Sequence, residues 1–186
     1  MTVDTATAGN VKTYALDGAH SSAGFTVRHM MIAKVHGSFS QMSGRLTIDP
    51  AQPQNAHVEV DIVVNSITTG SPERDNHLRT GDFFEVEVYP TIKFVSNHVD
   101  ITSDTQAQLV GDLTIRGVTK PVTLDVTGST AEAKDPWGNY RVGFEGTTKI
   151  KRSDFGLNWN AALETGGWLV GDDVTIAVDV QFVRAG

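Results

Sequence analysis

The sequence has no cysteine in its 186 residues. This absence excludes disulfide bonds, thiolate zinc sites, iron–sulfur clusters and a cysteine nucleophile. The motifs G-x-S-x-G, S-x-x-K, the P-loop and G-x-G-x-x-G are also absent, so the common signatures of serine nucleophiles and nucleotide binding are missing. We therefore expect a protein that is not an enzyme, with no catalytic residues and no required cofactor.

The six histidines lack the spacing of a metal site. Neither H-E-x-x-H nor a compact His-x-His pattern occurs. We expect no metal; the alternative is a site assembled from histidines that are distant in the sequence.

Long apolar runs are absent as well, and no stretch reaches the roughly 18 residues that could cross a bilayer as a helix. The N-terminal segment MTVDTATAGNVK lacks the basic region and apolar run of a secretory signal. We expect a cytoplasmic protein with a flexible segment at residues 1–10 and a single domain over residues 11–186.

Negative charge is in excess, with 15 Lys and Arg against 22 Asp and Glu and a formal net charge of −7. The basic residues are scattered rather than gathered in a stripe. Nucleic acid is therefore not an expected partner, because binding to phosphate backbones requires such a stripe.

The main pattern in the sequence is an alternation of apolar and polar residues with period two, which is typical of half-buried antiparallel strands. It predicts eight or nine strands, the first around Tyr14 and Leu16. The others are expected at residues 25–31, 38–49, 58–64, 91–101, 109–115, 122–126, 140–150 and 174–182. Within 91–101 the apolar positions change face, which predicts a bulge near residues 95–99.

Only one segment has the signals of a helix, near residues 72–80. Ser71 suits the N-cap, Pro72 the first helical position and Gly81 a left-handed C-terminal residue. Leu78 is its one large apolar side chain, so the helix can cover the mouth of a barrel but cannot build a core.

An all-β chain with this many strands must pack as two sheets or close on itself, and closure removes exposed edges. Glycines within or beside the strands permit the bends that a closed barrel needs. We therefore predict a closed antiparallel barrel of eight, or nine, strands, which can be filled with side chains or enclose a ligand.

Several segments together resemble the YceI-like family. They are DGAHSSAGFTVRHM, VHGSF at 35–39, SITTGSPERDNHLRTGDFF followed by YPTIKF, GDLTIRGVTKPV at 111–122 and KRSDFGLNW at 151–159. The resemblance covers nearly the whole chain and implies a lipocalin-like barrel that binds a polyisoprenoid lipid, with no established catalysis. Many members of the family are periplasmic and carry a signal peptide, a pattern that this sequence lacks.

An isoprenoid of roughly 40 carbons at about 0.3 kcal/mol per heavy atom could gain ~12 kcal/mol, mostly from apolar contact. Inward apolar residues are therefore the candidate lining, with plain core packing as the alternative for each. They are Phe25, Val27, Met31, Phe39, Leu46, Val60, Ile62, Phe94, Leu113, Val126 and Phe144. Residues 154–173 lack strand alternation and predict a loop across the rim, in which Trp159 and Trp168 either gate an opening or anchor the loop.

Polar candidates lie around the predicted helix and on the second strand. Arg74, His77 and Arg79 could hold a polar head group, because arginine offers paired donors to phosphate. Alternatively, the two arginines are bound by Asp75, Asp82 or Glu85 and attach the helix to the barrel, the reading we favour. His29 shares the inward face of its strand and is either a core histidine or a polar ligand contact.

These observations predict a carrier or sequestering protein for a polyprenyl or isoprenoid quinone lipid, which would be its partner and bound ligand. Two alternatives are an enzyme acting on such a lipid and a stress-related protein with an incidental cavity. Transient contact with a membrane would accompany lipid exchange. An exposed edge near the bulge at 95–99 would allow a homodimer.

Overall fold

The computed structural model describes residues 10–128 and 131–186, so the expected flexible segment lies, apart from Asn10, outside the described residues. The strands are β1 (Lys12–Leu16), β2 (Ser22–His29), β3 (Ala33–Phe39), β4 (Met42–Ile48), β5 (His57–Val63), β6 (Ile67–Thr68), β7 (Thr91–Ile101), β8 (Gln106–Ile115), β9 (Val118–Gly128), β10 (Ala133–Lys134), β11 (Tyr140–Lys151) and β12 (Val170–Arg184). The helices are α1 (Pro72–Arg79) and four short 3-10 helices, η1 (Gly18–His20), η2 (Pro53–Asn55), η3 (Val64–Ser66) and η4 (Arg152–Phe155). None of these described helices has the length and apolar character that crossing a membrane requires.

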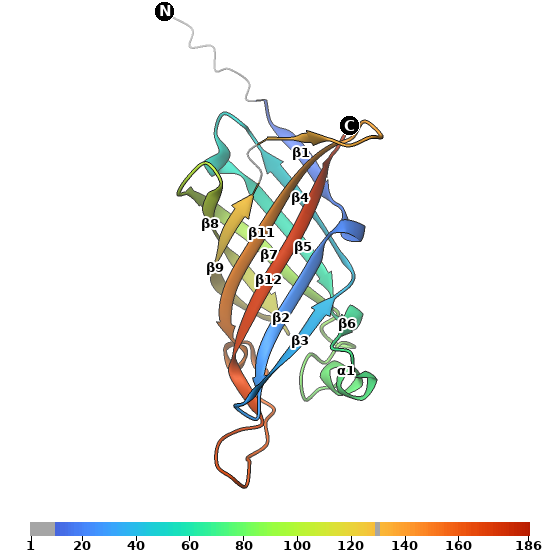
Figure 1. Ribbon diagram of the computed structural model, residues 1–186, viewed down its shortest axis with the longest axis vertical. Helices are drawn as coiled ribbons and strands as arrows, with labels where there is room; N and C mark the ends of the chain where they lie inside the picture. Colours follow the sequence, from blue (N-terminus) through green and yellow to red (C-terminus); the bar gives the residue numbers. More distant parts are fainter. Residues whose placement is uncertain (1–9, 129–130) are drawn as a thin grey trace, which may run out of the picture.

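The strands close into a tall barrel (Figure 1). β12 pairs along one edge with β11, from Asp173 opposite Lys151 to Val183 opposite Arg141. Along its other edge β12 pairs first with β2 and then with β1, so β1 and β2 act as one strand interrupted at η1. β3 and β4 occupy the next position in the same way. When β1 with β2, and β3 with β4, are each counted as one strand, the barrel has eight strands. The predicted closed antiparallel all-β barrel is therefore confirmed.

The third predicted strand, residues 38–49, is wrong as one element. β3 ends at Phe39 and β4 begins at Met42, because the two halves have different neighbours. β4 pairs with β5, whereas the end of β3 pairs with the short β6. The chain from β6 leads into α1, which lies beside the barrel at the end away from the two termini (Figure 1).

The predicted bulge in β7 is confirmed. The register of β7 against β8 shifts between Ser96 and His98. Ser96 is buried, and its hydroxyl accepts a hydrogen bond of 2.8 Å from the backbone N–H of Val58. The shift explains why the inward positions pass from Phe94 to Val99.

The helix α1 forms for the reasons that the sequence predicts at its start. The Ser71 hydroxyl accepts a hydrogen bond from the Arg74 backbone N–H, and Pro72 occupies the first turn. The C-terminal prediction is wrong: the helix ends at Arg79, its C-cap Thr80 is extended, and the left-handed residue that follows is Glu85 rather than Gly81. Residues 81–84 and 86–88 form turns on either side of Glu85.

Two separate apolar clusters form the core. The larger one gathers beside α1, β6 and η4 and includes Val64, Ile67, Phe83 and Phe155. The smaller one, toward the chain termini, consists of Tyr14, Leu46 and Phe182 with their half-buried neighbours. The middle of the barrel lies between these two clusters.

Arg141 on β11 connects the turn before its strand to the break between β1 and β2. Its guanidinium donates to Asp17 at 2.6 Å and to Asp135 at 2.9 Å. The hydrogen bond from Arg141 is the largest effect that lowers the pKa of Asp17 to about 2, and His20 contributes next. The pKa of Asp135 is lowered further, again chiefly by Arg141.

We expect Arg141→Gln to lower the free energy of unfolding at neutral pH. The destabilisation relative to wild type should become smaller at acidic pH. A carboxylate with a lowered pKa in the folded state stabilises above its unfolded pKa, and this stabilisation disappears as the pH falls through the folded value. The difference in the free energy of unfolding between wild type and variant should therefore shrink from about pH 4 to about pH 2. Urea titrations at three pH values measure it, and a difference that is constant with pH would contradict the assignment.

Candidate ligand-binding cavity

A cavity of about 870 Å³ occupies the barrel between the two core clusters. This volume lies toward the upper end of the range of small-molecule sites, about 300 to 1,000 Å³. Its walls are mostly apolar and come from all eight strands of the barrel. The predicted lining residues found on it are Phe25, Val27, Phe39, Leu46, Val60, Ile62, Phe94, Leu113, Val126 and Phe144.

These residues differ in how tightly they are packed. Phe39, Leu46 and Leu113 are buried and belong to the two core clusters. Val60 and Val126, in contrast, are only half-buried although they point into the barrel. Incomplete burial of inward side chains is what an empty interior produces, so the middle of the barrel is hollow.

Three inward phenylalanine rings leave the middle of the barrel open, because each ring lies against a glycine of a neighbouring strand. The pairs are Phe25 with Gly37, Phe94 with Gly111 and Phe144 with Gly128. A Cβ atom at Gly37 would lie 2.2 Å from the ring of Phe25, and one at Gly128 would lie 2.1 Å from that of Phe144. Glycine thus lets the rings lie along the wall, where a larger residue would push them inward.

Two predicted lining residues are misplaced. β2 ends at His29, and Met30 and Met31 both have left-handed backbone conformations in the turn to β3. The alternation that seemed to include Met31 therefore stops before it, and the Met31 side chain is exposed. Trp168 is also exposed and lines neither this cavity nor the pocket next to it.

A second pocket of about 410 Å³ opens beside the large cavity, between β2, β3, α1 and the loop that precedes β12. It shares lining residues with the cavity, among them Phe25, Leu78 and Val170, so the two spaces adjoin. Besides Phe25 and Val27, which line both spaces, four other predicted residues line this pocket. They are His29, Arg74, His77 and Trp159.

The arginines of α1 are also attached to the barrel, as favoured from the sequence, but through other partners. Arg74 donates to the hydroxyl and the carbonyl oxygen of Thr69, at 2.7 and 2.9 Å. Arg79 donates to the carbonyl oxygen of Ile67 at 2.9 Å and lies outside both spaces. The expected carboxylates are used elsewhere: Asp75 accepts hydrogen bonds from Thr69.

The remaining two acids bind other residues. Glu85 pairs with Arg116 at 3.0 Å. His77 Nε2 lies 2.7 Å from Asp82 Oδ2, and the imidazole ring packs edge-on against Trp159 with a centroid distance of 4.8 Å. Backbone carbonyl oxygens, together with the Thr69 hydroxyl and the Asn76 amide oxygen, thus replace carboxylates as the acceptors for Arg74 and Arg79.

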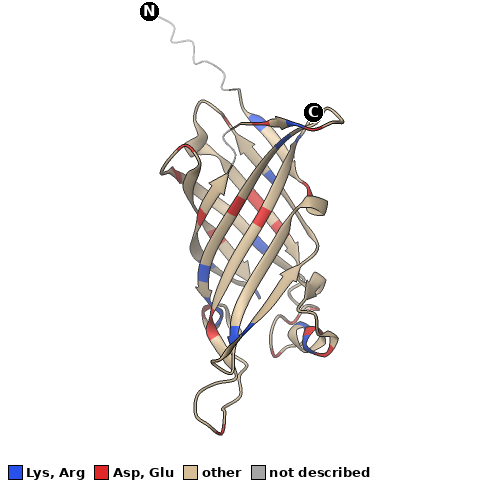
Figure 2. Cartoon of the chain, in the orientation of Figure 1, with Lys and Arg blue, Asp and Glu red and all other residues tan. Residues whose placement is uncertain are grey.

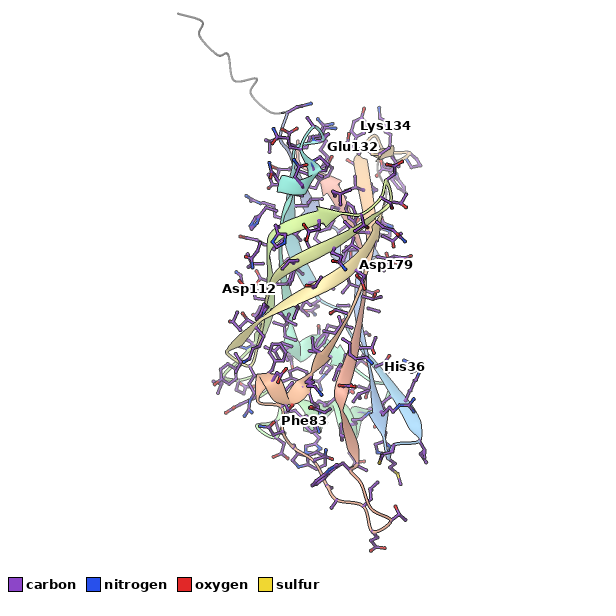
Figure 3. The ribbon with its side chains drawn as sticks, turned by 90° about the vertical axis from the view of Figure 1, so that its left-hand side faces the viewer. His36, Phe83, Asp112, Glu132, Lys134 and Asp179 are labelled. Carbon is purple, nitrogen blue, oxygen red and sulfur yellow. The ribbon has the colours of Figure 1, made fainter. Side chains whose placement is uncertain are left out.

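A polar cluster at the other end of the cavity was not predicted. The Tyr14 hydroxyl donates to Glu132 at 2.6 Å and Lys12 donates to the same carboxylate at 2.7 Å, while Arg184 lies 3.6 Å away. Figure 3 places Glu132 at the end with the chain termini and Phe83 at the opposite end. Lys12, Tyr14 and Glu132 line the cavity there.

The protonation of this cluster follows from its contacts. Burial, followed by the hydrogen bond to Glu132, raises the pKa of Tyr14 to about 12. Hydrogen bonds from Lys12 and Tyr14 lower the pKa of Glu132. The cavity therefore ends at a charged carboxylate that is already neutralised by its neighbours.

Arg152, at the start of η4, is a buried residue that was also missed. Its guanidinium donates to the carbonyl oxygens of Leu157 at 2.6 Å, Trp159 at 2.8 Å and Gly171 at 2.8 Å. Burial lowers its pKa. Arg152 lines the cavity, and its contacts hold together the two ends of the segment between η4 and β12. The loop predicted at residues 154–173 is shorter than expected, because η4 extends to Phe155 and β12 begins at Val170, and most of it projects beyond the barrel rather than across its rim (Figure 1).

The sequence profile of the YceI-like domain matches residues 14–182, which span nearly the whole barrel. The chain belongs to the YceI-like family. Proteins called UPF0312 are its sequence relatives. One from Pseudomonas savastanoi is 39% identical over 76% of this chain and 73% of its own length. One from Shewanella denitrificans is 40% identical over 81% of this chain and 80% of its own.

Several solved structures have a similar fold. BcnA of Burkholderia cenocepacia has a TM-score of 0.76 and 26% identity, covering 89% of this chain and 98% of its own. The YCEI protein of Campylobacter jejuni has a TM-score of 0.72 and 31% identity, covering 86% and 90%. A polyisoprenoid binding domain from Saccharophagus degradans has a TM-score of 0.68 over 92% and 98% of the two chains, but at 18% identity it indicates the fold alone.

This YceI-like chain shows no cluster of three or more His, Asp or Glu side chains suited to a metal ion within residues 10–128 and 131–186. Several titratable groups that line the two spaces already have partners. Glu132 accepts from Lys12, and Arg74 and Arg152 donate to backbone carbonyl oxygens. The two adjoining spaces in this chain thus form an apolar chamber with polar groups at its two ends.

Proposed function

We propose that the protein binds a long-chain polyisoprenoid lipid, of the polyprenyl or isoprenoid quinone type, inside the barrel and sequesters or transports it. The observation that carries the proposal is the apolar cavity of about 870 Å³. At about 0.3 kcal/mol per heavy atom, a tail of roughly 40 carbons supplies ~12 kcal/mol of favourable contact without any reaction. The name of the Saccharophagus degradans neighbour, a polyisoprenoid binding domain, agrees with this cargo.

The polar head group would lie in the second pocket, with the tail in the barrel. His29, Arg74 and His77 line that pocket and offer donors to a quinone carbonyl or a phosphate. Arg74 is oriented by Thr69, so little side-chain freedom remains to be lost on binding.

Native mass spectrometry of freshly purified protein tests this proposal. We expect an additional apolar mass that organic extraction releases, and saturable binding of a long-chain polyprenol or isoprenoid quinone to the extracted protein. A saturated fatty acid serves as the comparison, because it shares the apolar character but lacks the branched isoprenoid chain. Extracted protein that binds neither isoprenoid lipid would overturn the proposal.

A further inference from the structure

Four exposed apolar side chains form one surface at the end of the barrel away from the termini. We call it the apolar tip: Met30, Met31 and Ile32 in the β2–β3 turn, exposed by 43%, 65% and 81%, and Trp168, exposed by 59%. The Met30 N–H donates to the carbonyl oxygen of Leu169 at 2.8 Å, and the space above Gly167 is filled by the Met31 sulfur. The turn and the loop before β12 are therefore held together.

The backbone of this turn is unfavourable for the residues that occupy it. Met30 has φ of 51° and Met31 has φ of 61°, and Ile32 N–H closes the turn on His29. Such turns favour Asn-Gly, because both central residues need positive φ. The chain instead places two large apolar residues there, in a strained conformation and in contact with water, which folding alone does not explain.

The apolar tip stands beside the opening of the second pocket. Arg28, His29, Leu169 and Val170, the residues next to the tip in both segments, line that pocket. A surface that binds the apolar tip would therefore also lie next to the second pocket, which adjoins the barrel cavity.

Charged residues surround the tip. Arg28 and Lys34 face each other in register on β2 and β3, both are exposed, and neither forms an ion pair within the described part of the chain. Figure 2 shows basic residues at this end of the barrel. Acidic residues are present too: Glu164 is exposed on the loop, and Asp173 pairs with Lys151 at 3.6 Å.

We propose that the apolar tip docks on the surface of a phospholipid bilayer, with its four side chains among the head groups and acyl chain ends and with Arg28 and Lys34 on lipid phosphates. The choice of a bilayer rests in part on the proposed function, because an isoprenoid cargo resides in membranes. It also rests on size. A stable dimer buries roughly 800 Å² per partner from about 20 to 30 residues, whereas a few apolar side chains beside basic ones suffice for interfacial binding.

Binding to vesicles of phosphatidylcholine, with and without phosphatidylserine, tests the proposal by co-sedimentation. We expect Met30→Asn with Met31→Gly to weaken binding about tenfold or more while the melting temperature stays equal or rises, since Asn-Gly suits the turn. Arg28→Ser with Lys34→Ser should weaken binding to the phosphatidylserine vesicles by roughly 25-fold, the effect of two basic residues at about 1 kcal/mol each.

A matched control compares the same Trp→Ser change at the apolar tip and at the opposite end of the barrel. Trp168→Ser should reduce binding, whereas Trp137→Ser, at a residue 83% exposed in the turn between β10 and β11, should not. Equal binding by wild type and the Asn-Gly variant, or an equal loss from both tryptophan changes, would overturn docking by the tip. So would sedimentation equilibrium showing a dimer that the Asn-Gly variant abolishes, with no vesicle binding by wild type.

Failure of docking and failure of the cargo proposal are distinguishable. Val126→Trp, which fills the cavity far from the tip, should bind vesicles as wild type does. A wild type that binds vesicles but no isoprenoid lipid would leave the docking surface standing and remove the cargo. If the wild type binds isoprenoid lipid in detergent but does not bind vesicles, the cargo proposal stands and the docking proposal is wrong.

Discussion

Replacing Arg152 with methionine should lower the free energy of unfolding by about 3 to 5 kcal/mol. Arg152 is 6% exposed, and its guanidinium donates to the carbonyl oxygens of Leu157, Trp159, Val170 and Gly171. Methionine fills a similar space but donates nothing, so the carbonyl oxygens of Leu157, Trp159 and Gly171 lose this donor, at about 1 to 3 kcal/mol each before relaxation. The Val170 carbonyl oxygen keeps a hydrogen bond of 2.7 Å from Asn160. Urea titration measures the loss.

Two comparisons make this prediction specific. Arg152→Lys keeps the charge but has no planar fork of donors, so it should recover only a small part of the stability. Arg45→Met removes an exposed arginine from β4 and should change stability by less than about 0.5 kcal/mol. Equal losses from Arg152→Met and Arg45→Met would mean that the carbonyl contacts of Arg152 stabilise nothing. Faster hydrogen exchange in residues 157–170 of the Arg152→Met variant would locate the damage in the loop.

The strands could be predicted because their signal is local. Alternation with period two is present in the residues of β5, β8, β11 and β12 themselves. The break between β3 and β4 has no such signal, because alternation continues across it and the break depends on which strand lies next to each half. The end of β2 was missed for the same reason: Met31 continues the pattern formally, but the turn begins at Met30.

The apolar lining could be predicted more fully than the polar contacts. An inward position on a strand is a local property, whereas the partner of a polar group is not. Tyr14 and Glu132 are 118 positions apart, and Arg152 binds carbonyl oxygens, which every residue possesses. The volume of the cavity also escapes prediction, since it depends on glycines of one strand lying under aromatic rings of the next.

Val126→Trp should reduce the affinity for isoprenoid lipid by about tenfold or more, because the indole occupies space in the middle of the barrel that the tail requires. Val126 is half-buried, lines the cavity and lies opposite Gly146 on β11, so the larger ring meets open space rather than packed core. Leu113 is less suitable for the same change, since it is buried in the larger cluster and tryptophan there would overpack it.

Thr127→Trp is the matched control, because Thr127 is the next residue of β9 and is exposed on the outer face. It adds the same ring to the same strand without entering the cavity, so lipid affinity should remain that of wild type. Titration of extracted protein with an isoprenoid quinone measures both variants, and melting temperatures show whether each is folded. If Val126→Trp folds and binds as tightly as Thr127→Trp, the lipid does not lie in the barrel. Because the two variants differ only in the side of the sheet that carries the ring, a difference in affinity between them reports occupation of the interior itself.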